Sequence, residues 1–245
     1  MPVFKSLDIS ENAKHAISHG IFKAISQDIP EIISDYKLPT NNGVGQFRWN
    51  FIHKRVEENL GGRFQHSYVP RGPWKVLLLF EMELGFTFSI MSEHNLMRLQ
   101  RHLPKNPHYL EALISKNVGY DVIQGQMRLV NYESSRSPSD VEKLRDVLLT
   151  DFAGIIKNHI LILFDHYNNN ITSIKAVLLT PQFDTAFEED WGMYIKEPYI
   201  IGRESILNSM ATEDLETFVS LKPKKNEELN EALISLPPKS NVVGK

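Results

Sequence analysis

The chain has 245 residues, with 27 Lys and Arg against 30 Asp and Glu, and it has no cysteine. The absence of cysteine excludes disulfides, thiolate nucleophiles, cysteine-ligated zinc and iron–sulfur clusters. With 42% hydrophobic and 23% charged residues, the composition is typical of a globular protein that buries a sizeable core.

Signals for secretion or membrane insertion are not found in the sequence. The first residues lack the basic and apolar segments of a signal peptide. The longest apolar runs, 76–80 and 160–164, are far shorter than the ~20 residues of a spanning helix. We therefore expect a cytoplasmic protein.

The N-terminal half predicts helices followed by a β region. Apolar residues three and four apart predict helices over residues 9–25, 30–36 and 44–60. Strands are predicted next, over residues 64–69, 74–80 and 86–91. The continuous apolar run of the second strand indicates a central strand covered on both faces, and the alternation of the third indicates one covered and one wetter face. Two helices and one strand should follow, over residues 92–103, 108–116 and 119–130.

The C-terminal half predicts a second hairpin. The capping-box spacing of Ser139 and Glu142 predicts a helix over 140–157. Strands over 159–164 and 171–180 enclose an asparagine-rich turn. After Pro181 the chain is less regular, and the remaining predicted elements are a helix at 206–210 and a strand at 215–221.

These elements predict an α+β fold. We expect a single domain over residues 1–221, in which helices flank two antiparallel β-hairpins, and a mobile charged tail over 222–245. Whether the hairpins share one sheet is not determined by the pattern.

The net charge of −3 hides an uneven distribution. Residues 48–105 contain nine Lys and Arg against five acids, whereas residues 182–231 contain five against twelve. The basic middle is a candidate surface for nucleic acid, and the acidic C-terminal region is a candidate surface for a partner protein.

Catalytic signatures are weak. The chain lacks a GxxxxGK[ST] phosphate loop, GxGxxG, GxSxG and HExxH. Arg101 and His108 have an Arg-x6-His spacing that loosely resembles the motif of HEPN-type ribonucleases, although two prolines interrupt it and that family is all-helical. Glu81, just after a central strand, could hold Mg²⁺ in a nuclease but lacks the expected lysine. His15 and His19 share a helix face without a third ligand nearby, so we predict no metal site and no cofactor.

A second set of residues favours contact with nucleic acid. Arg71, Trp74 and Lys75 place two cations and a large aromatic ring at the start of a central strand. Cations pair with phosphates and Trp stacks on bases. Arg98 extends this basic region.

The run that includes Arg-Gly-Pro-Trp-Lys at 71–75, Phe-Ser-Ile-Met at 88–91 and His-Tyr-Leu-Glu-Ala-Leu at 108–113 resembles an uncharacterised domain family of Gram-positive bacteria and their mobile elements. The resemblance covers roughly residues 10–200 and carries no assigned activity. It implies a role in phage–host conflict or a toxin–antitoxin system. It adds His108 and Tyr109 to Arg71, Trp74 and Lys75 as residues to test first.

Three functional hypotheses follow, and the sequence does not determine whether the protein is an enzyme. The first is an intracellular conflict protein that engages nucleic acid through the basic middle. The second is a non-catalytic inhibitor or antitoxin partner that binds a protein through its acidic end. The third is a metal-dependent nuclease.

Overall fold

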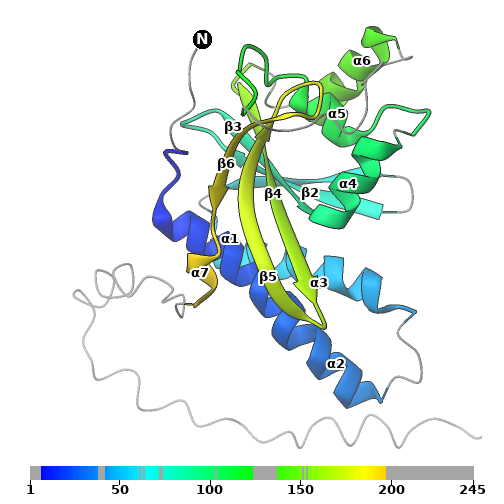
Figure 1. Cartoon of the computed structure of the whole chain (residues 1–245), viewed down its shortest axis with the longest axis vertical. Helices are drawn as coiled ribbons and strands as arrows, with labels where there is room; N and C mark the ends of the chain where they lie inside the picture. Colours follow the sequence, from blue (N-terminus) through cyan, green and yellow to red (C-terminus); the bar gives the residue numbers. More distant parts are fainter. Residues whose placement is uncertain are drawn as a thin grey trace, which may run out of the picture. The chain divides into compact units, whose positions relative to one another are not determined.

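The structure, a computed structural model, describes residues 7–196 apart from 38–41, 61, 63, 72–73, 103, 124–136, 151 and 153. Its elements are, in chain order, α1 (Glu11–Lys23), the π-helical turn η1 (Ala24–Asp28), α2 (Ile29–Tyr36), α3 (Val44–Leu60), β1 (Gln65–Arg71), β2 (Trp74–Glu81), β3 (Phe86–Ser92), α4 (Glu93–Arg101), α5 (Tyr109–Ile114), α6 (Pro138–Leu148), β4 (Asn158–Tyr167), β5 (Asn170–Leu179), β6 (Thr185–Asp190) and α7 (Met193–Lys196) (Figure 1).

One six-stranded sheet contains both predicted hairpins. Its strand order is β1-β2-β3-β4-β5-β6. Strands β1–β3 and strands β4–β6 are two antiparallel meanders, and β3 and β4 join them as a parallel pair in which Phe88 lies opposite Ile160. The α+β fold is therefore confirmed, and the two hairpins belong to one sheet.

Helices cover both faces of this sheet. On one face, α1 and α3 pack against the strands through a buried cluster that includes Ile17, Ile52, Phe88 and Ile162. On the other face, α4, α5 and α6 enclose a second cluster around Phe80, Leu110 and Leu161. Side chains alternate between the two faces along each strand, and because both faces are covered, the central strands are buried over most of their length.

Strand β3 differs from the expectation of one wetter face. Thr87 and Ser89 are fully buried on the face of the sheet that α4, α5 and α6 cover, although their alternation with apolar residues is typical of a half-exposed strand. The ring of His159 on the neighbouring β4 satisfies both hydroxyl groups, with Nδ1 at 2.8 Å from Thr87 Oγ1 and Nε2 at 3.0 Å from Ser89 Oγ. A neutral imidazole donates through one nitrogen and accepts through the other, so the three side chains form a closed buried network.

This network predicts a stability that falls at acidic pH. Burial lowers the pKa of His159 to about 3, against an ordinary value of 6.5. Below about pH 6.5, His159 therefore binds a proton in the unfolded chain but stays neutral in the folded chain. Protonation then favours the unfolded chain, so stability present at neutral pH is lost as the pH falls towards 3. We expect His159 alone to remove about 2 kcal/mol between pH 7.5 and pH 5. Urea unfolding at both pH values should show this loss diminished in His159→Gln and unchanged in the exposed control His102→Gln.

Asn117, which follows α5, holds the ends of two strands together. Its side chain is fully buried and makes three hydrogen bonds to backbone groups. Nδ2 donates to the carbonyls of His159 and Leu179, both at 2.8 Å, and Oδ1 accepts from the His159 N–H at 2.7 Å. The β4–β5 ladder begins only at Leu161 and Val177, so the amide takes the place of the missing strand partner.

The first two predicted helices form one continuous rod. Helix α1 begins at the cap Ser10, whose Oγ accepts from the Ala13 N–H, and passes through η1 into α2. Pro30 lacks an N–H, and its ring crowds the carbonyl four residues earlier. The wider turn of η1 lies just before Pro30 and accommodates it.

Other boundaries differ in the second half. The cap of α6 is Ser137 with Pro138 in the first turn, not Ser139, and the helix ends at Leu148 instead of 157. Residues 119–123 form no strand, and 124–130 lie outside the described residues. Strand β6 was not predicted. The elements predicted at 206–210 and 215–221, and the proposed domain boundary at 221, also lie outside the described residues. Among the residues described, no helix combines the length and apolar character needed to cross a membrane.

Candidate functional site

The predicted Arg-Gly-Pro-Trp-Lys corner lies at the join of β1 and β2. Trp74 pairs with Arg71 across the two strands, and its side chain is 45% exposed. Alternation along β2 places Trp74 on the face of Val76, which α4 and α5 cover, and exposed Lys75 on the opposite face with Leu77. The two side chains therefore point to different sides of the sheet. Residues 72–73 and the side chain of Arg71 are outside the described part.

Helix α4 presents a basic surface to solvent. Ser92 caps it through a hydrogen bond from the Asn95 N–H, and Leu96 and Leu99 anchor its inner face. The outer side and the loop after it carry exposed side chains that we name the α4 strip: His94, Arg98, Arg101, His102 and Lys105.

The cations of the α4 strip have no counter-charge nearby in the sequence, because no acid occurs between Glu93 and Glu111. Glu93 itself binds Lys175 Nζ at 3.1 Å and Ser173 Oγ at 3.1 Å. Within the described part of the chain, the side chains of Arg98, Arg101 and Lys105 make no hydrogen bond or ion pair. A surface of this kind attracts phosphate groups.

The structure places His108 and Tyr109 away from solvent. His108 is the cap of α5: its Nδ1 accepts from the Leu110 N–H at 3.2 Å, and the Glu111 carboxylate accepts from the His108 N–H at 3.3 Å. Tyr109 is buried in the core beneath α5. Arg101 is exposed in the last turn of α4, so this helix cap and this surface cation occupy different environments.

Glu81 acts as a turn residue. Its Oε2 accepts from the Leu84 N–H at 2.6 Å, which closes the turn between β2 and β3. Gly85 completes this turn with a φ of +75°, a conformation that L side chains rarely adopt. In the part of the chain that the structure describes, no three His, Asp or Glu side chains form a group that could hold a metal ion.

A groove that the sequence did not reveal runs between α3 and β1. It has a volume of about 610 Å³. Its lining consists of Asn50, His53, Lys54, Glu57, Glu58, Leu60, Gly62, Phe64, His66, Tyr68 and Leu79. This size falls in the range of sites that bind small molecules or short peptide segments.

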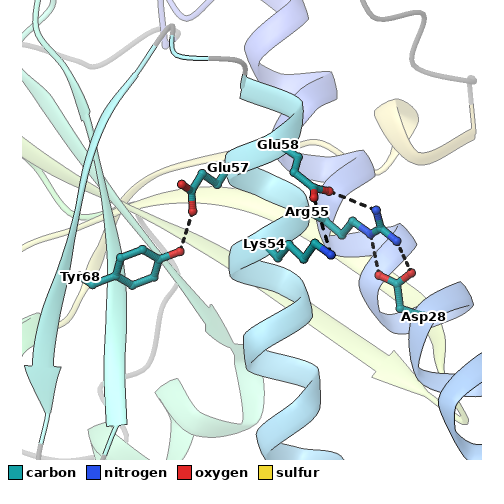
Figure 2. Close-up of polar contacts among 6 residues, drawn as sticks. All are labelled: Asp28, Lys54, Arg55, Glu57, Glu58 and Tyr68. Carbon is teal, nitrogen blue, oxygen red and sulfur yellow. Dashed lines mark hydrogen bonds and ion pairs between the residues drawn. The ribbon is translucent and has the colours of Figure 1, made fainter. Parts of the chain in front are cut away.

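Glu57 is the centre of the groove's polar network. Its Oε2 accepts from Tyr68 Oη at 2.8 Å, and its Oε1 lies 3.1 Å from His66 Nε2. Figure 2 shows Tyr68 reaching from its strand towards Glu57 on α3. Burial and the carboxylate of Glu57 raise the pKa of Tyr68 to about 12, so the phenol stays protonated and donates to Glu57.

Aromatic rings line the same side of α3. The His53 ring lies 5.8 Å from the Tyr68 ring, which lies 6.0 Å from the His66 ring. Burial lowers the pKa of His53 to about 4, more than the nearby Glu57 raises it. His53 is therefore neutral near pH 7 and provides no counter-charge for Glu57.

A separate ion-pair network lies on the neighbouring side of α3. Arg55 binds both carboxylate oxygens of Asp28, each at 2.7 Å, and also Glu58 at 3.1 Å (Figure 2). The hydrogen bond to Asp28 raises the pKa of Arg55. Glu58 lies 3.8 Å from Lys54 as well, so its charge is balanced within α3.

The comparisons with known proteins give a family without an activity. None of the curated proteins or solved structures compared with the chain matches it. A model of a family of unknown function, DUF5986, matches residues 6–236, which confirms the expectation of an uncharacterised family. The match covers nearly the whole chain, and the chain therefore belongs to the DUF5986 family.

Proposed function

We propose that the protein binds nucleic acid through the α4 strip and acts in the cytoplasm as a toxin or defence component in conflict between bacteria and mobile elements. The observation that carries the proposal is the row of exposed cations at Arg98, Arg101 and Lys105. They have no acidic neighbours in sequence and no ion-pair partners among the described residues. A side chain held by an internal ion pair must break that pair before it binds phosphate, and these side chains have no such pair with a described residue.

The position of Trp74 also favours nucleic-acid binding on the α4 side of the sheet. It is nearly half exposed and projects to the side of the sheet that α4 covers. An exposed indole can stack on an unpaired base, an interaction worth about 1–3 kcal/mol per base. Cations that contact phosphates and an aromatic ring that stacks on bases together favour a single-stranded ligand.

The binding test compares two charge-matched double variants. Arg98→Ala/Arg101→Ala should weaken binding of a fluorescein-labelled single-stranded oligonucleotide about tenfold or more at moderate salt, measured by fluorescence anisotropy. It should also reduce the slope of log affinity against log salt by about 1.4, since each lost phosphate contact contributes about 0.7. The control Lys143→Ala/Arg145→Ala removes two cations that pair with Asp140 and Asp146 on α6, and it should leave both quantities unchanged. Absence of binding at low salt would rule out the proposal.

The conflict role has its own test. Induced expression of the chain should arrest bacterial growth, and Arg98→Ala/Arg101→Ala should relieve the arrest at equal protein level. Growth that continues normally during expression of the unmodified chain would separate nucleic-acid binding from toxicity and would contradict the toxin role.

A further inference from the structure

The groove beside α3 adjoins an open sheet edge. Strand β1 is hydrogen-bonded only to β2, and within the described part of the chain its outer backbone has no partner. Seven residues form this edge, from Gln65 to Arg71, and most of its side chains are exposed. Natural proteins usually shorten, cover or charge such an edge because it pairs readily with another extended chain.

The groove opens towards this edge. One side of α3 packs against α1, where Asn59 Nδ2 donates to the Ala16 carbonyl at 3.1 Å. The opposite side, with His53 and Glu57, faces the strand. His66 and Tyr68 lie opposite Leu79 and Leu77 of β2, so both point to the α3 face and form the floor of the groove.

The charged side chains of the groove favour a cationic occupant. Its lining has two carboxylates and one ammonium group. Arg55 and Lys54 balance Glu58, whereas the neighbours of Glu57 are Tyr68 and His66. A carboxylate next to aromatic rings is a suitable site for a Lys or Arg side chain, which gains both an ion pair and cation–π contacts.

We propose that this groove binds an extended peptide segment of a partner protein, which adds to β1 as a further antiparallel or parallel strand and places a Lys or Arg side chain on Glu57. Alternate residues of an added strand point to the same face as His66 and Tyr68, which is the face of the groove. Backbone pairing supplies affinity, and Glu57 supplies the preference for a cation. The site is on the opposite face of the sheet from the α4 strip, and the inference does not depend on nucleic-acid binding.

A library of random seven-residue peptides displayed on phage and selected on the full chain tests the proposal. Selected peptides should carry Lys or Arg at one position among β-branched residues. A synthetic copy should lose at least about tenfold in affinity against Glu57→Gln, the loss expected for one charge-assisted hydrogen bond. The control Glu142→Gln, which removes an equal charge from exposed α6, should bind as the unmodified chain does. N-methylation of alternate backbone amides in the peptide should abolish binding, because it removes the donors that pair with β1.

The proposal requires that binding depend both on Glu57 and on the backbone amides of the peptide. Failure to enrich any peptide, or a selected peptide that tolerates either Glu57→Gln or N-methylation, overturns the proposal. Glu57 is at the surface, and an unchanged thermal midpoint of Glu57→Gln will show that the variant is folded. A dimer of the chain that dissociates on Glu57→Gln, seen by sedimentation, would assign the groove to a second copy and also overturn it.

Discussion

Asn117→Ala is expected to lower the free energy of unfolding by about 3–5 kcal/mol. The substitution removes three hydrogen bonds at once and leaves the His159 N–H and the carbonyls of His159 and Leu179 without partners. Each buried backbone group that loses its partner costs about 1–3 kcal/mol. The effect should be large because all three groups lie beyond the first β4–β5 pair, Leu161 and Val177, at the end of the ladder away from the hairpin turn.

Urea unfolding measures this change, and Asn106→Ala is its control. Asn106 is exposed in the loop before α5 and makes no hydrogen bond to a described residue, so its replacement should alter stability by less than about 0.5 kcal/mol. A loss below 1 kcal/mol in Asn117→Ala would contradict the structural role assigned to this amide.

Arg55→Met should cost a similar amount, about 3 kcal/mol. The carboxylate of Asp28 is only 5% exposed, and Arg55 neutralises it through two short hydrogen bonds. Methionine keeps an unbranched apolar stem in place of the arginine stem but leaves the buried charge unpaired, which typically costs about 3–5 kcal/mol. Equilibrium unfolding of the variant at neutral pH gives the value.

The double variant Asp28→Leu/Arg55→Met separates loss of pairing from loss of packing. If an unpaired charge causes the destabilisation, removal of Asp28 as well should restore most of the lost stability. If the double variant is as unstable as Arg55→Met or less stable, the cost arises from packing between η1 and α3 and not from the unpaired charge.

The local spacing of apolar residues was sufficient to locate most helices and strands. The spacing of Ile52, Val56 and Leu60 located α3 at its observed bounds, and apolar runs located β2 and β4. These predictions succeed because burial of one helix face or both strand faces imposes its period on the sequence. Strand β6 was not predicted from the sequence because its three consecutive acids, Glu188–Asp190, are unfavourable for an isolated strand.

Tertiary contacts explain that strand. Lys14 of α1 pairs with Glu189, and Lys175 of β5 pairs with Glu188 at 3.4 Å. These cations balance the acids only after the sheet has formed. The parallel pairing of β3 with β4 is likewise invisible to local pattern, since it joins segments that are distant in the sequence.

The candidate surfaces show the same limit. The sequence identified Arg98 and Arg101, which the structure places on one exposed helix face, and Trp74, which is exposed at a strand end. The sequence could not show that the side chain of His108 caps α5 and is buried there. The groove was missed because its central residues, Glu57 and Tyr68, meet only after the chain reverses between α3 and β1. The recurrence of His53 and Glu57 at i and i+4, followed by His66 and Tyr68 at i and i+2, is a signal that could have indicated it.

The parallel junction of β3 and β4 has a consequence for the order of folding. Each meander joins its strands through short turns, so its pairing closes on the microsecond scale of hairpin formation. The junction must wait until residues 93–157 bring two distant strands together, a closure with a high entropic cost and high contact order. Until then β3 and β4 expose two unpaired backbone edges flanked by apolar side chains such as Phe88 and Ile160. We therefore expect folding to be limited by the docking of two preformed halves, and the interval before docking to be the stage most sensitive to aggregation.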